Sequence, residues 1–416
     1  MIDSLTNEKI TLLAGIFKKH LYNMDSTTIK RSRDVSSKHL IYIMSLIVCN
    51  NYSYQQAVAT FRFKKTINHV PTSQAINKKI LTGNYKHLID ELNQELITKF
   101  FNHNTNDPRY IAVDGSKVNL SRSLVKDNYQ IIGHRRHSTG MVSTLYDIKN
   151  QIPLTYQLTN SLNERIICYD QVLKLSHDNP ATNDIIIGDR GYYSSEVVSR
   201  FYGTKMDFIF RMKKSINEIK HMETLGIDDH TFTIAKNCIR IIRYFLPTGK
   251  FRMVANEKGG KPFKIIRKTH PYYLGTSLLN QVQYPIERLK ELYHQRWSIE
   301  EYYKNIKSSF CHGTFHSILP HAIDFEMSIQ VMICLLTRIF LKLRPCPQGW
   351  KNNYKVSTTL IINKILYKLL FNQSLECLFE TCLKILPILE TILIAQRVDR
   401  HFPRVQRFHY NKFFHE

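Results

Sequence analysis

Two short apolar runs, each followed closely by an aspartate, constrain the fold of this chain more than any other feature. Residues 111–113 precede Asp114, and residues 185–187 precede Asp189. Continuous apolar runs of this length predict buried strands. Aspartate after a strand is also an ordinary turn residue, so either motif alone is weak. Together they predict a sheet that carries two carboxylates to one edge, where ligands of α/β proteins gather.

The segment between and after these motifs predicts an α/β order of elements. Residues 140–147 and 152–158 alternate in a way that favours a hairpin, and residues 163–176 favour a helix. After the second aspartate, Ser194 or Ser195 is placed to cap a further helix. Strand, hairpin, helix, strand and helix is the sequence of elements expected for a mixed sheet covered by helices.

A long amphipathic helix is predicted to begin with Pro285 in its first turn, because apolar residues then recur every three or four positions. On this helix Tyr293, Arg296, Glu300 and Lys307 fall within an arc of about 60° beside the apolar stripe. A carboxylate between a guanidinium and an ammonium can hold a metal ion while its neighbours hold phosphate oxygens. An ion-paired helix flank is the alternative interpretation.

The spacing of these four residues, Tyr-x2-Arg-x3-Glu-x6-Lys, resembles the YREK signature of DDE transposases from bacterial insertion sequences. The motifs VDGS at Asp114 and GDRGY at Asp189 lie upstream in the order that this family uses. The resemblance extends from Arg109 to about Phe310. It implies an α/β fold with a ribonuclease-H-like mixed-sheet core, a β-rich insertion domain before the glutamate, a helical N-terminal domain and a helical C-terminal region.

The resemblance also implies a reaction, which is metal-dependent DNA cleavage at terminal inverted repeats followed by strand transfer. Asp114, Asp189 and Glu300 would be the catalytic carboxylates and would hold two Mg²⁺ ions, with Mn²⁺ able to substitute. We expect the Arg296 guanidinium to face a phosphate rather than the metal, because a fork of donors matches phosphate oxygens. The residues expected to contact DNA at the cut are Tyr293, Arg296, Lys307 and Arg190.

Two other functions are compatible with these motifs. One is a ribonuclease-H-like nuclease that cuts without strand transfer, and the other is a DNA-binding protein derived from a transposase that no longer cuts. The β-rich insertion and the YREK helix favour a transposase over the first, since a minimal nuclease needs neither. The presence of all three carboxylates favours a transposase over the second.

The charge of the chain indicates a polyanionic partner. The formal net charge is +24, from 58 lysines and arginines against 34 acidic residues. We expect the partners to be transposon-end and target DNA, with a homodimer on paired ends. The apolar runs are too short to cross a bilayer and the first residues do not resemble a secretory signal, so no membrane is expected. These features predict a cytoplasmic, nucleoid-associated protein.

The sequence divides into five predicted regions. In the first, Ser53 and the segment 71–73 open two short helices, which are equally compatible with a helix-turn-helix and with an ordinary bundle. In the third, strands separated by turns such as 247–249 carry basic residues, including Arg240 and Arg243, that would contact DNA or simply face solvent. The regions are 1–105, a helical DNA-end-binding domain; 106–206, the first part of the core; 207–282, the β-rich insertion; 283–320, the core helix with Glu300; and 321–416, a helical interface region with a basic tail.

Overall fold

The structure is a computed structural model that describes residues 4–395, apart from residues 28–34, 64–70, 84, 102–106, 133–136, 162, 179–182, 205, 235, 255–263, 311–314, 345 and 372–373. The predicted basic tail, from residue 397 onward, and the predicted turn at residues 259–260 therefore lie outside the described residues. Of the described helices, none is long and apolar enough to span a bilayer.

The described strands β1 to β8 form one eight-stranded sheet in the order β3-β2-β1-β4-β5-β8-β7-β6. Its first half contains β1 (Arg109–Leu120), β2 (Ser138–Asp147), β3 (Ile152–Thr159), β4 (Asp184–Gly188) and β5 (Asp207–Arg211). The β2–β3 pair is antiparallel, as the predicted hairpin requires, and β2 is also antiparallel to β1. Strands β1, β4 and β5 run parallel to one another. The predicted mixed α/β sheet is thus confirmed.

The sequence pattern predicted that the first strand would end at Asp114, but the strand continues beyond it. Strand β1 continues to Leu120, and Asp114 pairs with Thr144 of β2 in the middle of the ladder. The parallel pairing with β4, however, stops at Ala112. Asp114 therefore lies just beyond the point where the neighbouring strand on that side ends.

The second half of the sheet contains β6 (Asp229–Ile234), β7 (Asn237–Val254) and β8 (Lys264–Thr276), which are antiparallel to one another. The turn predicted at residues 247–249 is wrong, because β7 continues through it with an irregularity in its pairing. Strand β8 also joins β5 antiparallel, from Ile209 to Arg211, so the β-rich segment extends the same sheet. The short helix α8 (Asn217–Leu225) precedes β6.

Helices cover both faces of the first half of the sheet. The Ser143 hydroxyl on β2 donates to Gln171 of α6 (Glu164–Asp178) at 2.6 Å. The next residue, Thr144, lies 3.0 Å from the Tyr303 hydroxyl of α10 (Trp297–Ser309). Successive residues of a strand point to opposite faces, so α6 and α10 lie on opposite faces. Helix α7 (Ser195–Phe201) packs beside α6, and its predicted cap, Ser194, is confirmed because its hydroxyl accepts from Val197 N.

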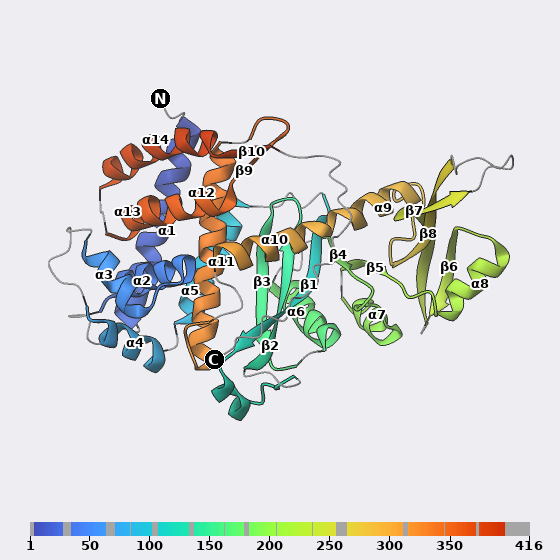
Figure 1. The fold of residues 1–416 in the computed structure, drawn as a ribbon, viewed down its shortest axis with the longest axis horizontal. Helices are drawn as coiled ribbons and strands as arrows, with labels where there is room; N and C mark the ends of the chain where they lie inside the picture. Colours follow the sequence, from blue (N-terminus) through green and yellow to red (C-terminus); the bar gives the residue numbers. More distant parts are fainter. Residues whose placement is uncertain are drawn as a thin grey trace.

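The predicted amphipathic helix is divided in two. Helix α9 (Ile286–Gln295) begins after Pro285, which caps it rather than forming its first turn, and α10 begins after Arg296. Arg296 itself keeps right-handed helical angles, φ −50° and ψ −30°, so α10 continues the path of α9. The two helices cross the sheet from the helical end of the molecule toward β7 and β8 (Figure 1).

The N-terminal helices are α1 (Ser4–Thr27), α2 (Ser37–Asn50), α3 (Tyr54–Arg62), α4 (Ser73–Thr82) and α5 (Lys86–Phe100). The two helix starts predicted here are confirmed: the hydroxyl of Ser53 accepts from Gln56 N, and that of Thr72 accepts from Ala75 N. Both short helices pack on α2. A short 3-10 helix, Arg122–Asp127, follows β1.

The C-terminal helices are α11 (Pro320–Leu343), α12 (Tyr354–Leu360), α13 (Tyr367–Phe371) and α14 (Leu375–Thr391), with a π-helical turn at Ile361–Leu366. Strands β9 (Trp350–Asn352) and β10 (Leu393–Ala395) form a separate small pair.

The two helical regions, which the sequence separates by more than two hundred residues, share one apolar core (Figure 1). The Phe61 ring of α3 lies 5.2 Å from Phe371 of α13, and Tyr42 of α2 lies 5.3 Å from Tyr367. Asn93 of α5 donates to the Ser328 carbonyl of α11 at 3.0 Å. The first and last helices therefore form a single helical body at one end of the sheet.

Candidate active site

The two predicted aspartates meet at the edge of the sheet where β4 ends. Asp189 follows the last residue of β4, and its Oδ1 accepts a hydrogen bond from Gly191 N at 2.6 Å, which folds the turn back on the strand. Asp114 lies beyond the parallel pairing of β1 and β4. The two carboxylates are close enough that the Asp189 charge raises the pKa of Asp114.

The pKa of Asp114 is raised from its ordinary 3.8 to about 6. Burial is the main cause, because it disfavours the charged form, and the negative charges of Asp189 and Glu164 add to it. The Arg296 guanidinium and the Gly115 N–H oppose this rise. A cation bound at this carboxylate would remove the penalty on the charged form.

Helix α10 is fixed against the same edge by Tyr303. The Tyr303 hydroxyl lies within hydrogen-bonding distance of the Asp114 carbonyl, at 2.9 Å, and of the Thr144 hydroxyl, at 3.0 Å. Glu300 is one helical turn before Tyr303 and is half-buried. The helix thus carries its glutamate to the strand that carries Asp114.

Arg296 contacts Glu300, which is the contact expected of an ion-paired helix flank. Its Nη2 lies 2.8 Å from Glu300 Oε1, as residues four apart on a helix readily do. Arg296 is only 8% exposed, and its Nε is buried with no acceptor among the described residues. The guanidinium also lies 5.8 Å from the ring of Tyr293, which is half-buried. A buried donor without an acceptor costs about 1–3 kcal/mol, so an acceptor supplied by a ligand would be favoured here.

Lys307 and Arg190 are exposed. Lys307 lies two turns beyond Glu300 on α10, and Arg190 lies in the turn after β4. In the described part of the chain neither side chain has a hydrogen bond or an ion pair. Both cations therefore face solvent, and Arg190 does so next to Asp189.

Glu164, the first residue of α6, is a third carboxylate at this edge that the sequence analysis missed. A Cβ atom built on Gly115 would lie 3.2 Å from Glu164 Oε1, and one built on Gly191 would lie 3.5 Å from Glu164 Oε2. Burial, followed by the Asp189 charge, raises the pKa of Glu164, while Lys117 opposes the rise. Glutamate in a first helical turn is common, so the sequence alone held no signal for this role.

The donor set at this edge suits a hard divalent cation, which takes carboxylate oxygens. Asp114 and Asp189 approach one another, while Glu300 is held by Arg296 and would have to release it to join them. Among the described residues, no three acidic, histidine or cysteine side chains already surround one point as metal ligands.

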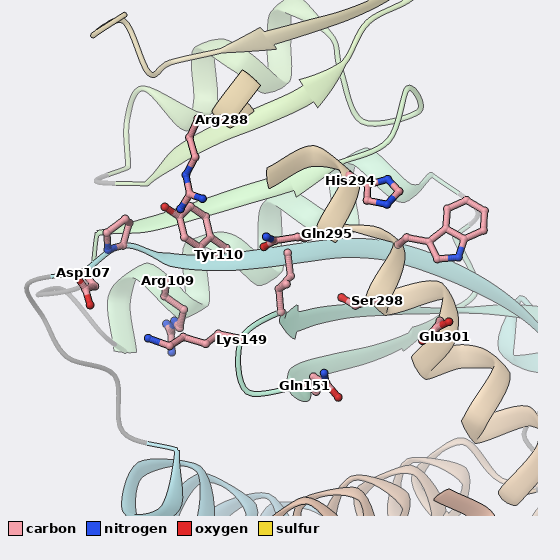
Figure 2. Close-up of a pocket in the computed structure, with 13 residues that line it drawn as sticks. Asp107, Arg109, Tyr110, Lys149, Gln151, Arg288, His294, Gln295, Ser298 and Glu301 are labelled. Carbon is pink, nitrogen blue, oxygen red and sulfur yellow. The ribbon is translucent and has the colours of Figure 1, made fainter. Parts of the chain in front are cut away.

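A cavity of about 720 Å³ lies elsewhere, between the start of β1, the β2–β3 turn and helices α9 and α10 (Figure 2). In it the Arg288 guanidinium lies 5.8 Å from the Tyr110 ring. None of the three predicted carboxylates lines this cavity. This cavity is therefore separate from the acidic edge.

Two arginines of the β-rich segment, expected to contact DNA or to face solvent, each form an ion pair with an aspartate. Arg240 is 1% exposed and forms a two-bond ion pair with Asp229, at 2.9 and 2.6 Å, and its Nη1 donates to the Tyr284 carbonyl at 2.7 Å. Arg243 pairs with Asp228. Their acidic partners, Asp229 in β6 and Asp228 just before it, could not be assigned to them from the sequence.

The fold and the edge described above define an α/β protein with an acidic site between two helices on opposite faces of a mixed sheet. The sequence of residues 105–336 matches the family described as Transposase DDE domain, and the chain belongs to that family. The prediction of a DDE transposase is thereby confirmed at the level of the family.

The chain is also similar to a solved structure titled "Cryo-EM structure of piggyBac transposase synaptic complex with hairpin DNA". The TM-score is 0.50 at 12% sequence identity, and the match covers 94% of this chain and 86% of that chain. At this identity the likeness concerns the fold alone. No curated protein is detectably similar in sequence.

Proposed function

We propose that this transposase belongs to the YREK group and acts on the terminal inverted repeats of an insertion sequence, cutting DNA and joining it to a target. The main support is that the family match spans residues 105–336, which include Asp114, Asp189 and Glu300. The ribonuclease-H-like core and the β-rich insertion are part of the same proposal.

In this proposal Asp114, Asp189 and Glu300 hold two Mg²⁺ ions, or Mn²⁺ in their place. When bound, such ions activate an attacking oxygen and stabilise a leaving oxygen. The raised pKa of Asp114 supports this role, because a carboxylate that is costly to ionise alone gains most from a neighbouring cation. Tyr303 fixes the spacing between α10 and the strand that carries Asp114.

The proposed phosphate contacts are divided between a buried and an exposed set. Arg296, with a free buried Nε beside Tyr293, would receive a phosphate oxygen at the acidic edge. Lys307 and Arg190, both exposed, would contact the backbone on either side. Binding DNA and metal would then exchange the Arg296–Glu300 pair for a phosphate on one partner and a cation on the other.

The proposed partners are the two transposon ends and target DNA, held by a homodimer on paired ends. The net charge of +24 supports a polyanionic partner. The similar piggyBac structure was solved with hairpin DNA, which supports DNA in the same way. A nucleoid-associated location would follow from such binding.

The test is cleavage of a supercoiled plasmid that carries the DNA flanking the gene, in Mg²⁺. We expect Asp114→Asn, Asp189→Asn and Glu300→Gln each to abolish cleavage with duplex binding largely intact, since each removes a metal ligand and no phosphate contact. Asp170→Asn, an exposed carboxylate on α6, is the matched control and should cut normally.

The reaction products of the wild type distinguish the proposed transposase from the two alternative functions. Cleavage without joined products would favour a nuclease that lacks strand transfer, and binding without any cleavage by the wild type would favour a non-cutting DNA-binding protein. Substantial cleavage by one of the three variants would remove that residue from the catalytic set.

A further inference from the structure

Helix α6 brings Glu164 to the acidic edge from the face opposite α10. Ser143 faces α6 and Thr144 faces α10, so the glutamates of the two helices approach the edge from opposite faces of the sheet. Asp114 interacts with both sides, because the charges of Glu164 and of Arg296, the partner of Glu300, both act on it. The edge is therefore flanked by carboxylates on both sides rather than on one.

The position of Glu164 is fixed by its neighbour and by two glycines. Arg165 Nε donates to the Gly191 carbonyl at 2.6 Å, which joins the start of α6 to the turn that follows Asp189. A Cβ atom at Gly115 would lie tightly against Glu164 Oε1, at 3.2 Å, and one at Gly191 would be in ordinary contact with Glu164 Oε2, at 3.5 Å. The glycines leave room for this carboxylate beside both aspartates.

Among the described residues, Glu164 has no hydrogen bond or ion pair that would explain its place as structural. The charges that act on its carboxylate are those of Asp189, Lys117 and Asp114. Glu300, by contrast, is neutralised by Arg296 at 2.8 Å. A half-buried carboxylate held beside another carboxylate is destabilising unless a cation joins them.

A second observation indicates that a ligand belongs at this edge. Arg296, more than nine-tenths buried, interacts with Asp114, and its Nε finds no acceptor in the segments that the structure describes. That donor suits a phosphate oxygen, while the carboxylates suit a cation. The aspartates would hold a divalent cation, and the free nitrogen of Arg296 would hold a phosphate oxygen beside it.

We propose that Glu164 is a further metal ligand, which completes the coordination of a divalent ion at Asp189 from the α6 face. This inference rests on the proposed function and adds a fourth carboxylate to its three. It also assigns each helix one side of the site, with α6 serving the Asp189 side and α10 the Asp114 side.

The experiment is titration of the full chain with Mn²⁺, without DNA, with free Mn²⁺ followed by electron paramagnetic resonance. We expect Glu164→Gln to weaken Mn²⁺ binding at least about tenfold. Removing a residue that only hydrogen-bonds to a metal ligand already costs about this much affinity. Glu164→Asp, which keeps a shorter carboxylate, should fall between this variant and the wild type. Glu196→Gln, an exposed first-turn glutamate of α7, is the matched control and should bind as the wild type does.

Thermal melting in EDTA separates a ligand from a structural residue. Glu164→Gln should melt at or above the wild-type temperature without metal, because repulsion from Asp189 is removed. Wild-type Mn²⁺ affinity in Glu164→Gln, with affinity lost in Asp114→Asn, would overturn this inference and leave the proposed function standing. Wild-type affinity in both Asp114→Asn and Asp189→Asn would overturn the proposed function itself. If Glu164→Gln fails to fold, wild-type affinity in Glu164→Asp overturns the inference, and an intermediate affinity supports it.

Discussion

Replacing Asp114 with asparagine should make the metal-free protein more stable while removing a proposed catalytic group. The pKa of Asp114 rises from 3.8 to about 6 on folding, chiefly because burial disfavours its charge. At a pH above both pKa values, this shift lowers the free energy of unfolding by about 3 kcal/mol. Asparagine has a similar shape and never ionises, so Asp114→Asn should recover most of it.

The sign of the pH dependence follows from the direction of the shift. Because the native carboxyl holds its proton more tightly than the unfolded one, the destabilisation is absent below about pH 4 and grows as pH rises. We expect Asp114→Asn to raise the free energy of unfolding by about 3 kcal/mol at pH 8 and by about 1.5 kcal/mol at pH 5. Urea unfolding in EDTA at both pH values measures it, and Asp170→Asn should change stability by less than about 0.5 kcal/mol.

Divalent metal should nearly cancel this difference in stability at pH 8. At free Mg²⁺ about 100 times its Kd, a protein that binds it gains about 2.7 kcal/mol, and Asp114→Asn should gain little of this. An Asp114→Asn variant that is no more stable than the wild type at pH 8, or whose gain does not shrink at pH 5, would refute the argument from burial.

Three further predictions test the positioning helix, the charge and the outer strands. Arg296→Lys keeps the charge but loses the fork of donors, so plasmid cleavage should fall about 10- to 100-fold with Mn²⁺ affinity near wild type; unchanged cleavage would make Arg296 only a partner of Glu300. Non-specific DNA affinity should fall by about 10³-fold or more between 50 and 200 mM salt if about six phosphates are contacted. Fluorescence anisotropy measures it, and an affinity that does not change with salt would contradict the DNA-binding role of the +24 charge. Asp229→Ala should destabilise the fold by about 3 kcal/mol in urea unfolding, because Arg240 stays buried and unpaired. Asp228→Ala breaks the more exposed pair with Arg243 and should destabilise the fold by less than about 1 kcal/mol. Equal costs would show that burial of Arg240 does not matter.

Local signals in the sequence were reliable where one residue type decides one contact. Ser53, Thr72 and Ser194 cap the helices that their positions predicted, and the apolar run before Asp189 forms a buried strand. A cap is decided within four residues of the chain, so no distant partner is needed to predict it.

Predictions from the sequence failed where contacts with residues distant in the chain determine the structure. Asp114 and Gly115 have the composition of a turn, yet β2 pairs with both and extends the strand. Arg240 could not be separated from exposed arginines without knowing that Asp229 lies beside it across the β6–β7 pair. Glu164 reaches Asp189 only through the fold, since twenty-five positions separate them along the chain.

The shared core of the first and last helices has a consequence for how the protein is made. Helix α1 packs on α13 and α14, and α2 packs on α11, so the first hundred residues leave the ribosome well before their partners exist. At about 5–20 residues per second, they wait for roughly tens of seconds with apolar faces uncovered. The helical body can close only near the end of synthesis, when its latest segment inserts against its earliest. Until then the apolar faces of the nascent N-terminal helices are exposed to aggregation.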